Sequence, residues 1–103
     1  MYMHVVLMEI EADAAFHAEV EHWCDRVRGE CDGVLGYVYR ENTASRADGL
    51  GHTVIAHFVD EAAHDAYQAS PAHQGMKAFM APAIRRIVVF DGDVPALAPA
   101  PAA

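Results

Sequence analysis

The sequence has few cysteines and few basic residues, and each shortage excludes a class of protein. Its two cysteines, Cys24 and Cys31, are too few for a disulfide framework and form no CxxC motif, which favours free thiols in the cytoplasm. Seven basic residues stand against 15 acidic ones, a formal net charge of −8, so nucleic acid and anionic membranes are not expected as partners. No apolar run approaches the roughly 20 residues of a membrane span.

Apolar residues, by contrast, are in excess and make up 53% of the 103 residues. A chain of this length forms one domain with one core. A surplus over the usual range of about 45–50% favours apolar surface reserved for a second subunit. The domain is expected over residues 1–93. Residues 94–103, VPALAPAPAA, form a Pro/Ala-rich tail that is predicted to be disordered because it has little to bury.

The secondary-structure elements are predicted to run strand, helix, strand, strand, helix, strand. Apolar runs of strand length cover four segments, 2–10, 34–41, 52–59 and 84–91. An apolar stripe at helical spacing runs through 13–28. A second helix over 61–81 is interrupted by Ser70 and Pro71, which suit the cap and first turn of a new helix. This order is that of the ferredoxin-like fold, an α+β fold in which a four-stranded antiparallel sheet carries its helices on one face.

Alternate residues of a strand point to opposite faces of the sheet, and in these strands both sets of residues are apolar. Helices, however, would cover only one face. One set comprises Val5, Leu7, Ile55, Val59, Ile87 and Val89, and the other comprises Val6, Met8, Val54, Phe58, Val88 and Phe90. The face without helices needs a second cover, and the pairing of two copies sheet to sheet provides it. The sequence therefore predicts a homodimer closed through the sheet face, a dimeric α/β-barrel.

Seven histidines are the side chains best suited to acid–base chemistry near neutral pH. Four of them are expected to be structural. His17 and His22 are predicted on a solvated flank of the first helix, His64 on the surface, and His57 on the dimer face. The spacing of His17, Glu21 and Cys24 would also suit a metal ion, but the solvated flank is favoured and no metal site is predicted.

The other three histidines are the candidates for a functional site. His4 and His52 open two strands that are neighbours in this fold, and both are expected on the face that meets the helices. Their imidazoles are therefore predicted close together at one end of the layer between sheet and helices, where small-molecule pockets occur. His73 falls in the first turn of a helix, whose dipole disfavours imidazolium and predicts a depressed pKa. Tyr67 either turns its hydroxyl into the same space or closes the core.

Three segments carry a resemblance to a known family, MHVVLM at 3–8, GHTVIAHFVDEAAHDAYQASPAH at 51–73 and VVFDGD at 88–93. Over residues 2–93 the chain resembles the stress-responsive dimeric α/β-barrel (Dabb) family, and within it the cyclases that close a linear poly-β-keto thioester by aldol chemistry. The resemblance implies a barrel dimer with one pocket per subunit between helices and sheet. The family often has His-Pro-x-His where this chain has Ser70 at the first position.

The resemblance implies a cofactor-independent acid–base enzyme for a small poly-carbonyl substrate, most simply a polyketide cyclase. His73 would take a proton from a carbon between two carbonyls, Tyr67 would hold His73 or donate to the enolate oxygen, and His4 would donate to the attacked carbonyl or orient the substrate. His52 would be the fourth member of the site. An apolar wall that curls the substrate is expected from Met8, Phe16, Trp23, Val54, Met76, Phe79 and Met80.

Two other functions remain open on the sequence. A cofactor-free or haem-linked monooxygenase of the related αβ-barrel group would use an Asn/Trp/His set, but Trp23 falls in the core stripe and Asn42 in a turn. A non-enzymatic stress-response or ligand-binding dimer explains the fold, the acidity and the apolar sheet equally well. The discriminating observation is whether a continuous pocket connects His4 and His73.

Overall fold

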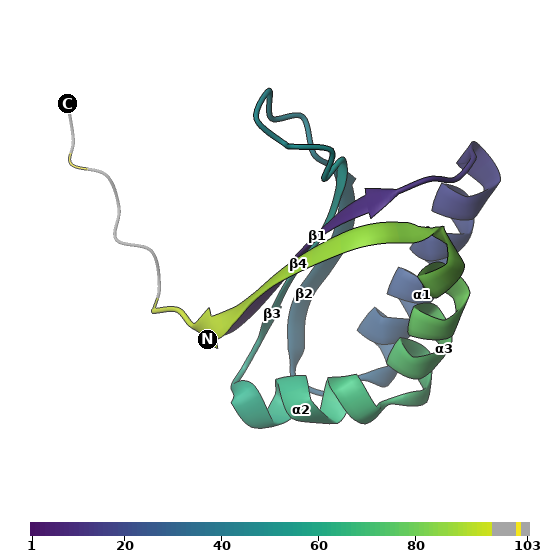
Figure 1. Ribbon diagram of the computed structural model, residues 1–103. Coiled ribbons are helices and arrows are strands. Elements are labelled where there is room, and N and C mark those ends of the chain that lie inside the picture. Colours follow the sequence, from purple (N-terminus) through teal and green to yellow (C-terminus); the bar gives the residue numbers. More distant parts are fainter. Residues whose placement is uncertain (96–100, 102–103) are drawn as a thin grey trace.

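The computed structural model describes residues 1–95 and 101, and its elements follow the predicted order (Figure 1). They are β1 (Tyr2–Ile10), α1 (Ala14–Glu30), β2 (Val34–Glu41), β3 (His52–Phe58), α2 (Glu61–Ala69), α3 (Pro71–Met80), a 3-10 turn (Ala81–Ala83) and β4 (Ile84–Asp93). Their bounds differ from the predicted ones by a residue or two. The predicted tail over 94–103 lies mostly outside the described residues. Its first residue, Val94, donates its amide to the Met1 carbonyl over 2.8 Å.

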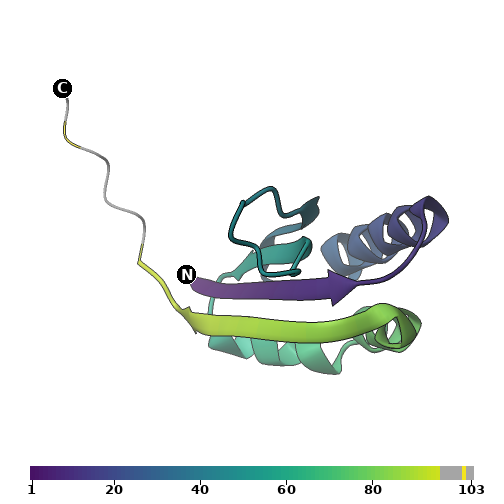
Figure 2. The same cartoon turned by 45° about the horizontal axis from the view of Figure 1, so that its top comes forward.

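The four strands form one antiparallel sheet in the order β2-β3-β1-β4. The helices lie on one face of this sheet (Figure 1), and the edge strand β4 runs side by side with β1 (Figure 2). The ferredoxin-like βαββαβ fold expected from the sequence is therefore confirmed. None of the helices in the described part of the chain is long and apolar enough to cross a membrane.

Side-chain caps set where each helix begins. The Asp13 carboxylate accepts from the Phe16 amide over 3.0 Å at the start of α1, and Asp60 does the same for Ala63 over 2.9 Å at the start of α2. Ser70 caps α3 by accepting from the amide of its third residue over 3.1 Å. Such caps satisfy amides that have no partner within the helix. The break predicted at Ser70 is confirmed, and α2 and α3 run in different directions (Figure 1).

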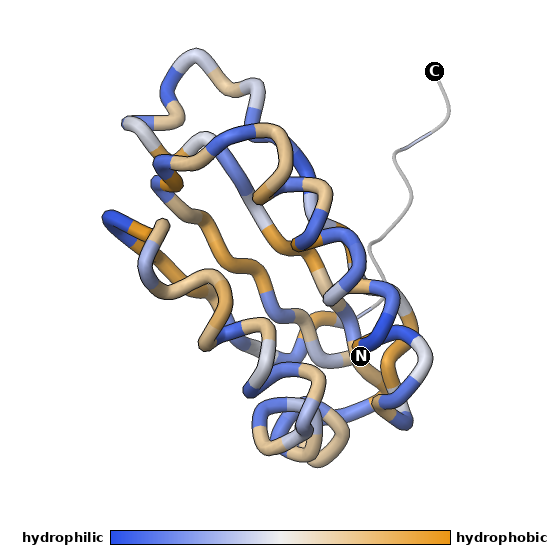
Figure 3. The backbone as a smooth tube through the Cα atoms, turned by 90° about the vertical axis from the view of Figure 1, so that its right-hand side faces the viewer, coloured by the Kyte–Doolittle hydropathy of each residue, from blue (hydrophilic) through white to orange (hydrophobic). Residues whose placement is uncertain are grey.

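The core lies between the sheet and the helices. Its buried apolar side chains come from β1, β2 and β3 on one side and from all three helices on the other, and include Val6, Met8, Tyr37, Val54, Phe58, Val20, Val27, Tyr67, Met76 and Met80. The most hydrophobic stretches follow the strands, whereas the helices alternate between polar and apolar residues (Figure 3). The chain thus buries one stripe of each helix against one face of the sheet.

The register of β4 corrects the predicted grouping of strand residues. Val6 lies opposite Val89 and Met8 opposite Ile87, so these β4 residues share the face that meets the helices. Phe90 pairs instead with Val5 on the other face. Alternation fixes which residues of one strand share a face, but it does not say which face that is, so the grouping across strands was wrong for β4.

The face of the sheet without helices is apolar and exposed. Its exposed large hydrophobic side chains include Ile55, Val88 and Phe90. Strand β4 is open on its helix face as well, because Ile87 and Val89 are 52% and 49% exposed. The first surface is the one predicted to meet a second subunit. The second forms a wall of the cavity described below.

Candidate active site

A cavity of about 590 Å³ opens between the sheet and the helices. Its walls come mainly from β1 and β4 on the sheet side, with one residue each from β2 and β3, and from α2 and α3 on the helix side. The volume lies within the range of about 300–1,000 Å³ that is typical of small-molecule sites. Three of the four predicted catalytic residues line it, His4, Tyr67 and His73.

Tyr67 lies between the two cavity histidines. The centroid of its ring is 4.4 Å from that of His73 and 5.7 Å from that of His4. His4 is brought there by β1, and the other two by helices that meet at Ser70. The Ser70 hydroxyl donates to the Tyr67 carbonyl over 2.7 Å and accepts from the His73 amide, so the helix break holds Tyr67 and His73 next to each other.

His52 does not join this group, and its predicted closeness to His4 was wrong. Because β1 and β3 are antiparallel, the first residue of β3 lies at the far end of β1, where His52 pairs with Met8 and not with His4. His52 stacks there on His17 with 4.3 Å between ring centroids. His17 is not on a solvated flank as predicted, because it is half-buried and its Nδ1 lies 2.8 Å from the Tyr39 hydroxyl.

His64 was also misplaced by the sequence analysis. It was predicted on the surface, but it is only 6% exposed and packs on Phe58 and His4, with ring centroids 5.3 and 4.9 Å away. The acidic start of α2 suggested a solvated helix, whereas position 64 falls on the buried side of that helix together with Tyr67, three residues later. His22 is exposed as predicted.

The predicted apolar wall divides into two groups. Met8, Val54, Met76 and Met80 line the cavity. Phe16, Trp23 and Phe79 do not, and pack on one another between α1 and α3, with ring centroids 5.1 Å apart for Phe16–Phe79 and 6.5 Å apart for Trp23–Phe79. A helical stripe identifies the buried side of a helix but does not separate a wall of the cavity from a helix–helix contact.

The proton positions of His73 follow from its backbone contact. Its Nδ1 lies 3.1 Å from the Gln68 carbonyl oxygen. A carbonyl only accepts, so Nδ1 carries the hydrogen and Nε2 holds a lone pair. Burial lowers the pKa of His73, the hydrogen bond to the Gln68 carbonyl acts in the opposite direction, and the nearby His4 and Lys77 lower the pKa further. The direction is the predicted one, although burial is the main cause. His73 is thus a neutral ring able to accept a proton.

His4 is held by a carboxylate that the sequence analysis did not single out. Its Nδ1 donates to Asp91 Oδ1 over 2.5 Å. Burial lowers the pKa of His4, while the hydrogen bond to Asp91 and its charge act in the opposite direction. A carboxylate in this position fixes the tautomer and stabilises the imidazolium when it forms. The antiparallel register that places residue 91 opposite residue 4 is not readable from either segment alone.

Tyr37 is a second residue that the sequence analysis missed. Its hydroxyl lies 2.8 Å from the Tyr67 hydroxyl, and both are buried. Burial raises the pKa of both phenols, and the hydrogen bond with Tyr37 lowers that of Tyr67 in part. Both hydroxyls therefore stay protonated near neutral pH. Either hydroxyl can donate in this pair, and when Tyr37 donates, the Tyr67 hydroxyl keeps its own hydrogen for another acceptor.

The fold is that of a small ferredoxin-like domain, and its cavity is lined by two histidines and a tyrosine. The family model for the stress responsive A/B barrel domain matches residues 3–94. The chain therefore belongs to the stress-responsive A/B barrel domain family, as its resemblance indicated. No curated protein matches it.

Solved structures share the fold over most of the chain. A dimeric ferredoxin-like protein of unknown function from Jannaschia sp. CCS1 is 25% identical, with a TM-score of 0.79 over 90% of this chain and 98% of that one. A hydroxynitrile lyase from Passiflora edulis is 16% identical, with a TM-score of 0.81 over 95% and 96%. An antibiotic biosynthesis monooxygenase is 17% identical, with a TM-score of 0.75 over 92% and 99%.

Proposed function

We propose that this protein is a cofactor-independent acid–base enzyme for a small poly-carbonyl substrate, and that its reaction is an intramolecular aldol cyclisation of the polyketide cyclase type. One observation carries the proposal. His4 and His73, far apart in the sequence, line one open cavity with Tyr67 between them. A protein that used this layer only as a core would fill the space with its methionine and aromatic side chains.

The reaction begins at Nε2 of His73. This nitrogen takes a proton from a carbon between two carbonyls, and the Tyr67 hydroxyl donates to the enolate oxygen that forms. The enolate carbon then attacks a distant ketone of the same chain, forming the new carbon–carbon bond and an alkoxide. The alkoxide then takes back the proton that His73 removed, which restores His73 as a neutral base. A general base within reach contributes typically about 10²–10⁴-fold in rate.

His4 serves the attacked carbonyl. Its Nδ1–H is engaged by Asp91, so the nitrogen left for the substrate is Nε2. When His4 carries a second proton taken from solvent, that nitrogen donates a hydrogen bond to the developing alkoxide and keeps its proton, and the Asp91 carboxylate stabilises the imidazolium. Met8, Met76 and Met80 bring the two reacting carbons together by folding the apolar part of the substrate. Holding reactive carbons in contact accounts for several further kcal/mol of barrier reduction, with an upper range of about 7–11 kcal/mol.

The assembly proposed with this function is a homodimer closed through the open sheet face. Phe90 and Ile55 are exposed there at 53% and 41%. Large contiguous apolar surface on a small domain typically marks an interface. The Jannaschia structure, which shares the fold, is described as dimeric. Dimerisation would cover this face and leave the cavity on the other side of the sheet.

The monooxygenase alternative receives no support from the cavity. The Trp23 indole packs between α1 and α3, and the Asn42 amide donates to the Leu50 carbonyl over 2.8 Å in the β2–β3 connection. Neither lines the cavity with the histidines. The ligand-binding alternative uses the same cavity without turnover, so an activity measurement separates it from the cyclase.

The test incubates the purified protein with linear poly-β-keto thioesters of increasing length and measures the cyclised product. Wild type is expected to accelerate ring closure over buffer, and His73→Ala to lose about 10²-fold or more of that acceleration. His22→Ala removes an exposed histidine of α1 and is expected to retain the wild-type rate. Circular dichroism checks that each variant folds. An equal rate in His73→Ala and wild type contradicts the proposal, and saturable binding without turnover favours the ligand-binding alternative.

A further inference from the structure

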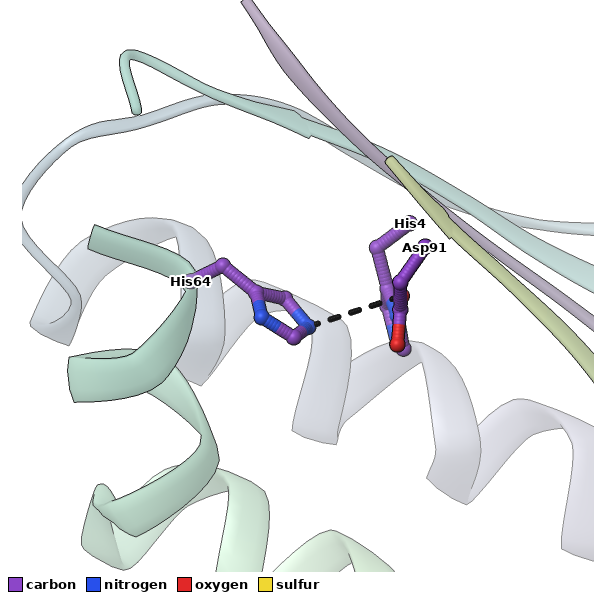
Figure 4. Close-up of side chains that lie close together, drawn as sticks. All are labelled: His4, His64 and Asp91. Carbon is purple, nitrogen blue, oxygen red and sulfur yellow. Dashed lines mark hydrogen bonds and ion pairs between the residues drawn. The ribbon is translucent and has the colours of Figure 1, made fainter. Parts of the chain in front are cut away.

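His64 has no part in the proposed reaction, although it lies beside the His4–Asp91 pair. Its Nε2 is 3.6 Å from Asp91 Oδ1, and that oxygen is 2.5 Å from His4 Nδ1. One ligand atom from each of the three residues lies within 4.8 Å of the other two. Figure 4 shows the His64 ring extending from α2 toward the pair on the two strands. Three elements far apart in the sequence thus bring two imidazoles and one carboxylate together.

We propose that His4, His64 and Asp91 form a zinc-binding site. Two imidazoles and a carboxylate are ligands that Zn²⁺ accepts, with a water or another molecule in the fourth position. The donor set does not suit Mg²⁺ or Ca²⁺, which prefer oxygen ligands. Both imidazoles are nearly completely buried, with 4% and 6% of their surface exposed, so the site is built into the molecule and is not a chance cluster of surface side chains.

The geometry requires local adjustment, since the three ligand atoms now lie within 4.8 Å of one another and must reach equal spacing around a metal ion. Ligand atoms on a tetrahedral zinc with bonds of about 2.0–2.1 Å lie roughly 3.3 Å apart. The His4–Asp91 distance must therefore open slightly, and the His64–Asp91 distance of 3.6 Å is already close to this value. The Asp91 side chain is 35% exposed on β4, whose helix face is uncovered, and it has room to rotate.

The two ring nitrogens of His64 have different surroundings. Its Nε2 lies 3.1 Å from the Gln68 side-chain amide nitrogen, which donates to it and so places the ring hydrogen on Nδ1; this amide must turn away when Nε2 binds zinc. That Nδ1 is buried and has no hydrogen-bond partner among the described residues. The Asp65 carboxylate is 3.7 Å away, where a small movement would let it accept this hydrogen. Zinc-bound histidines almost always donate their other nitrogen to such a partner.

This inference goes beyond the proposed function and has a consequence for it. Zinc bound to His4 would take up the lone pair of one imidazole nitrogen and replace its contact with Asp91. The occupied site and the acid–base site would then compete for the same side chain, and zinc would inhibit any reaction that needs His4.

The test measures metal binding directly and needs no substrate. Isothermal titration of the metal-free full-length chain with Zn²⁺ is expected to give one site per chain, and titration with Mg²⁺ no binding. His64→Leu and Asp91→Asn are expected to weaken zinc binding by about tenfold or more. His22→Ala and Cys31→Ser, which remove an exposed histidine and the more accessible thiol, are expected to bind zinc as the wild type does.

A second measurement uses only wild type, so it tests the proposal even if a variant fails to fold. In the NMR spectrum of wild type, Zn²⁺ is expected to shift the imidazole signals of His4 and His64 and to leave those of His22 and His57 in place. The proposal is overturned if wild type binds no zinc at one site per chain, if folded His64→Leu binds zinc as tightly as wild type, or if the shifted signals belong to other histidines.

Discussion

The phenol of Tyr67 packs against the imidazole of His73, with 4.4 Å between ring centroids and 51° between ring planes. The two residues belong to different helices, and the Ser70 hydroxyl joins them by bonding to the backbone of both. The break in the helix is therefore the device that builds this side of the cavity. A continuous helix over the same residues would separate Tyr67 from His73 by six positions and turn them apart.

The hydroxyl pair of Tyr37 and Tyr67 is expected to be strongly coupled. Tyr67→Phe leaves the buried Tyr37 hydroxyl without this partner and should cost about 1–3 kcal/mol of unfolding free energy. The double variant Tyr37→Phe/Tyr67→Phe should cost less than the sum of the single variants, because it leaves no orphaned hydroxyl. Urea unfolding of wild type, the two single variants and the double variant gives the four free energies of this double-mutant cycle. Strictly additive effects would show that the two hydroxyls do not interact.

Stability is expected to fall as the solution is acidified below neutral pH. Burial lowers the pKa values of His4, His52 and His73 from the ordinary 6.5, so the unfolded chain binds more protons than the folded one. The unfolding free energy is therefore highest above about pH 6.5 and decreases as the pH falls through this value. Urea unfolding between about pH 7.5 and about pH 5.5 measures the effect. Stability that rises on acidification over this range would contradict these shifts.

Two glycine-to-alanine substitutions are expected to change the stability of the protein in opposite directions. A Cβ on Gly75 in α3 would lie 2.4 Å from a ring atom of Trp23, so Gly75→Ala should destabilise the protein by about 1–3 kcal/mol. A Cβ on Gly29 in α1 would meet nothing within 4 Å, so Gly29→Ala should stabilise it by up to about 1 kcal/mol. Thermal unfolding compares the two. If Gly75→Ala were as stable as wild type, α3 would not lie this close to Trp23.

The open sheet face is expected to hold the homodimer together. Ile55→Asp places a charge in the centre of that face and should produce a monomer, since an unpaired charge buried in an apolar interface is costly. Ala62→Asp, which adds the same charge on the exposed part of α2, should remain dimeric. Sedimentation equilibrium measures the mass of each protein. A monomeric wild type, or an Ile55→Asp variant that stays dimeric, would exclude this interface.

The fold was predictable because its signals are local. The change from strand to helical periodicity and the Ser70-Pro71 break each act within a few residues, and each reappears in the structure. The position of His73 beside Tyr67 follows from the same break. Sequence reasoning therefore gave one side of the cavity with its residues in place.

The other side of the cavity depends on register, which no local pattern determines. His4 meets Asp91 and not His52 because β1 lies antiparallel to both of its neighbours, and 87 residues separate the two partners. His64 was missed for a related reason, since the buried side of a short helix depends on what packs against it. In both cases the neighbours of a histidine were determined by tertiary packing and not by the local sequence.

Exchange of hydrogen for deuterium at the carbon between the carbonyls of a β-keto thioester tests the central claim most directly. The measurement isolates the proton transfer assigned to His73 and does not require the substrate to be long enough to cyclise. In deuterated buffer, wild type is expected to accelerate exchange over the buffer rate, and His73→Ala to bring it close to that rate. Equal acceleration by His73→Ala and wild type, or none by wild type, would contradict the account.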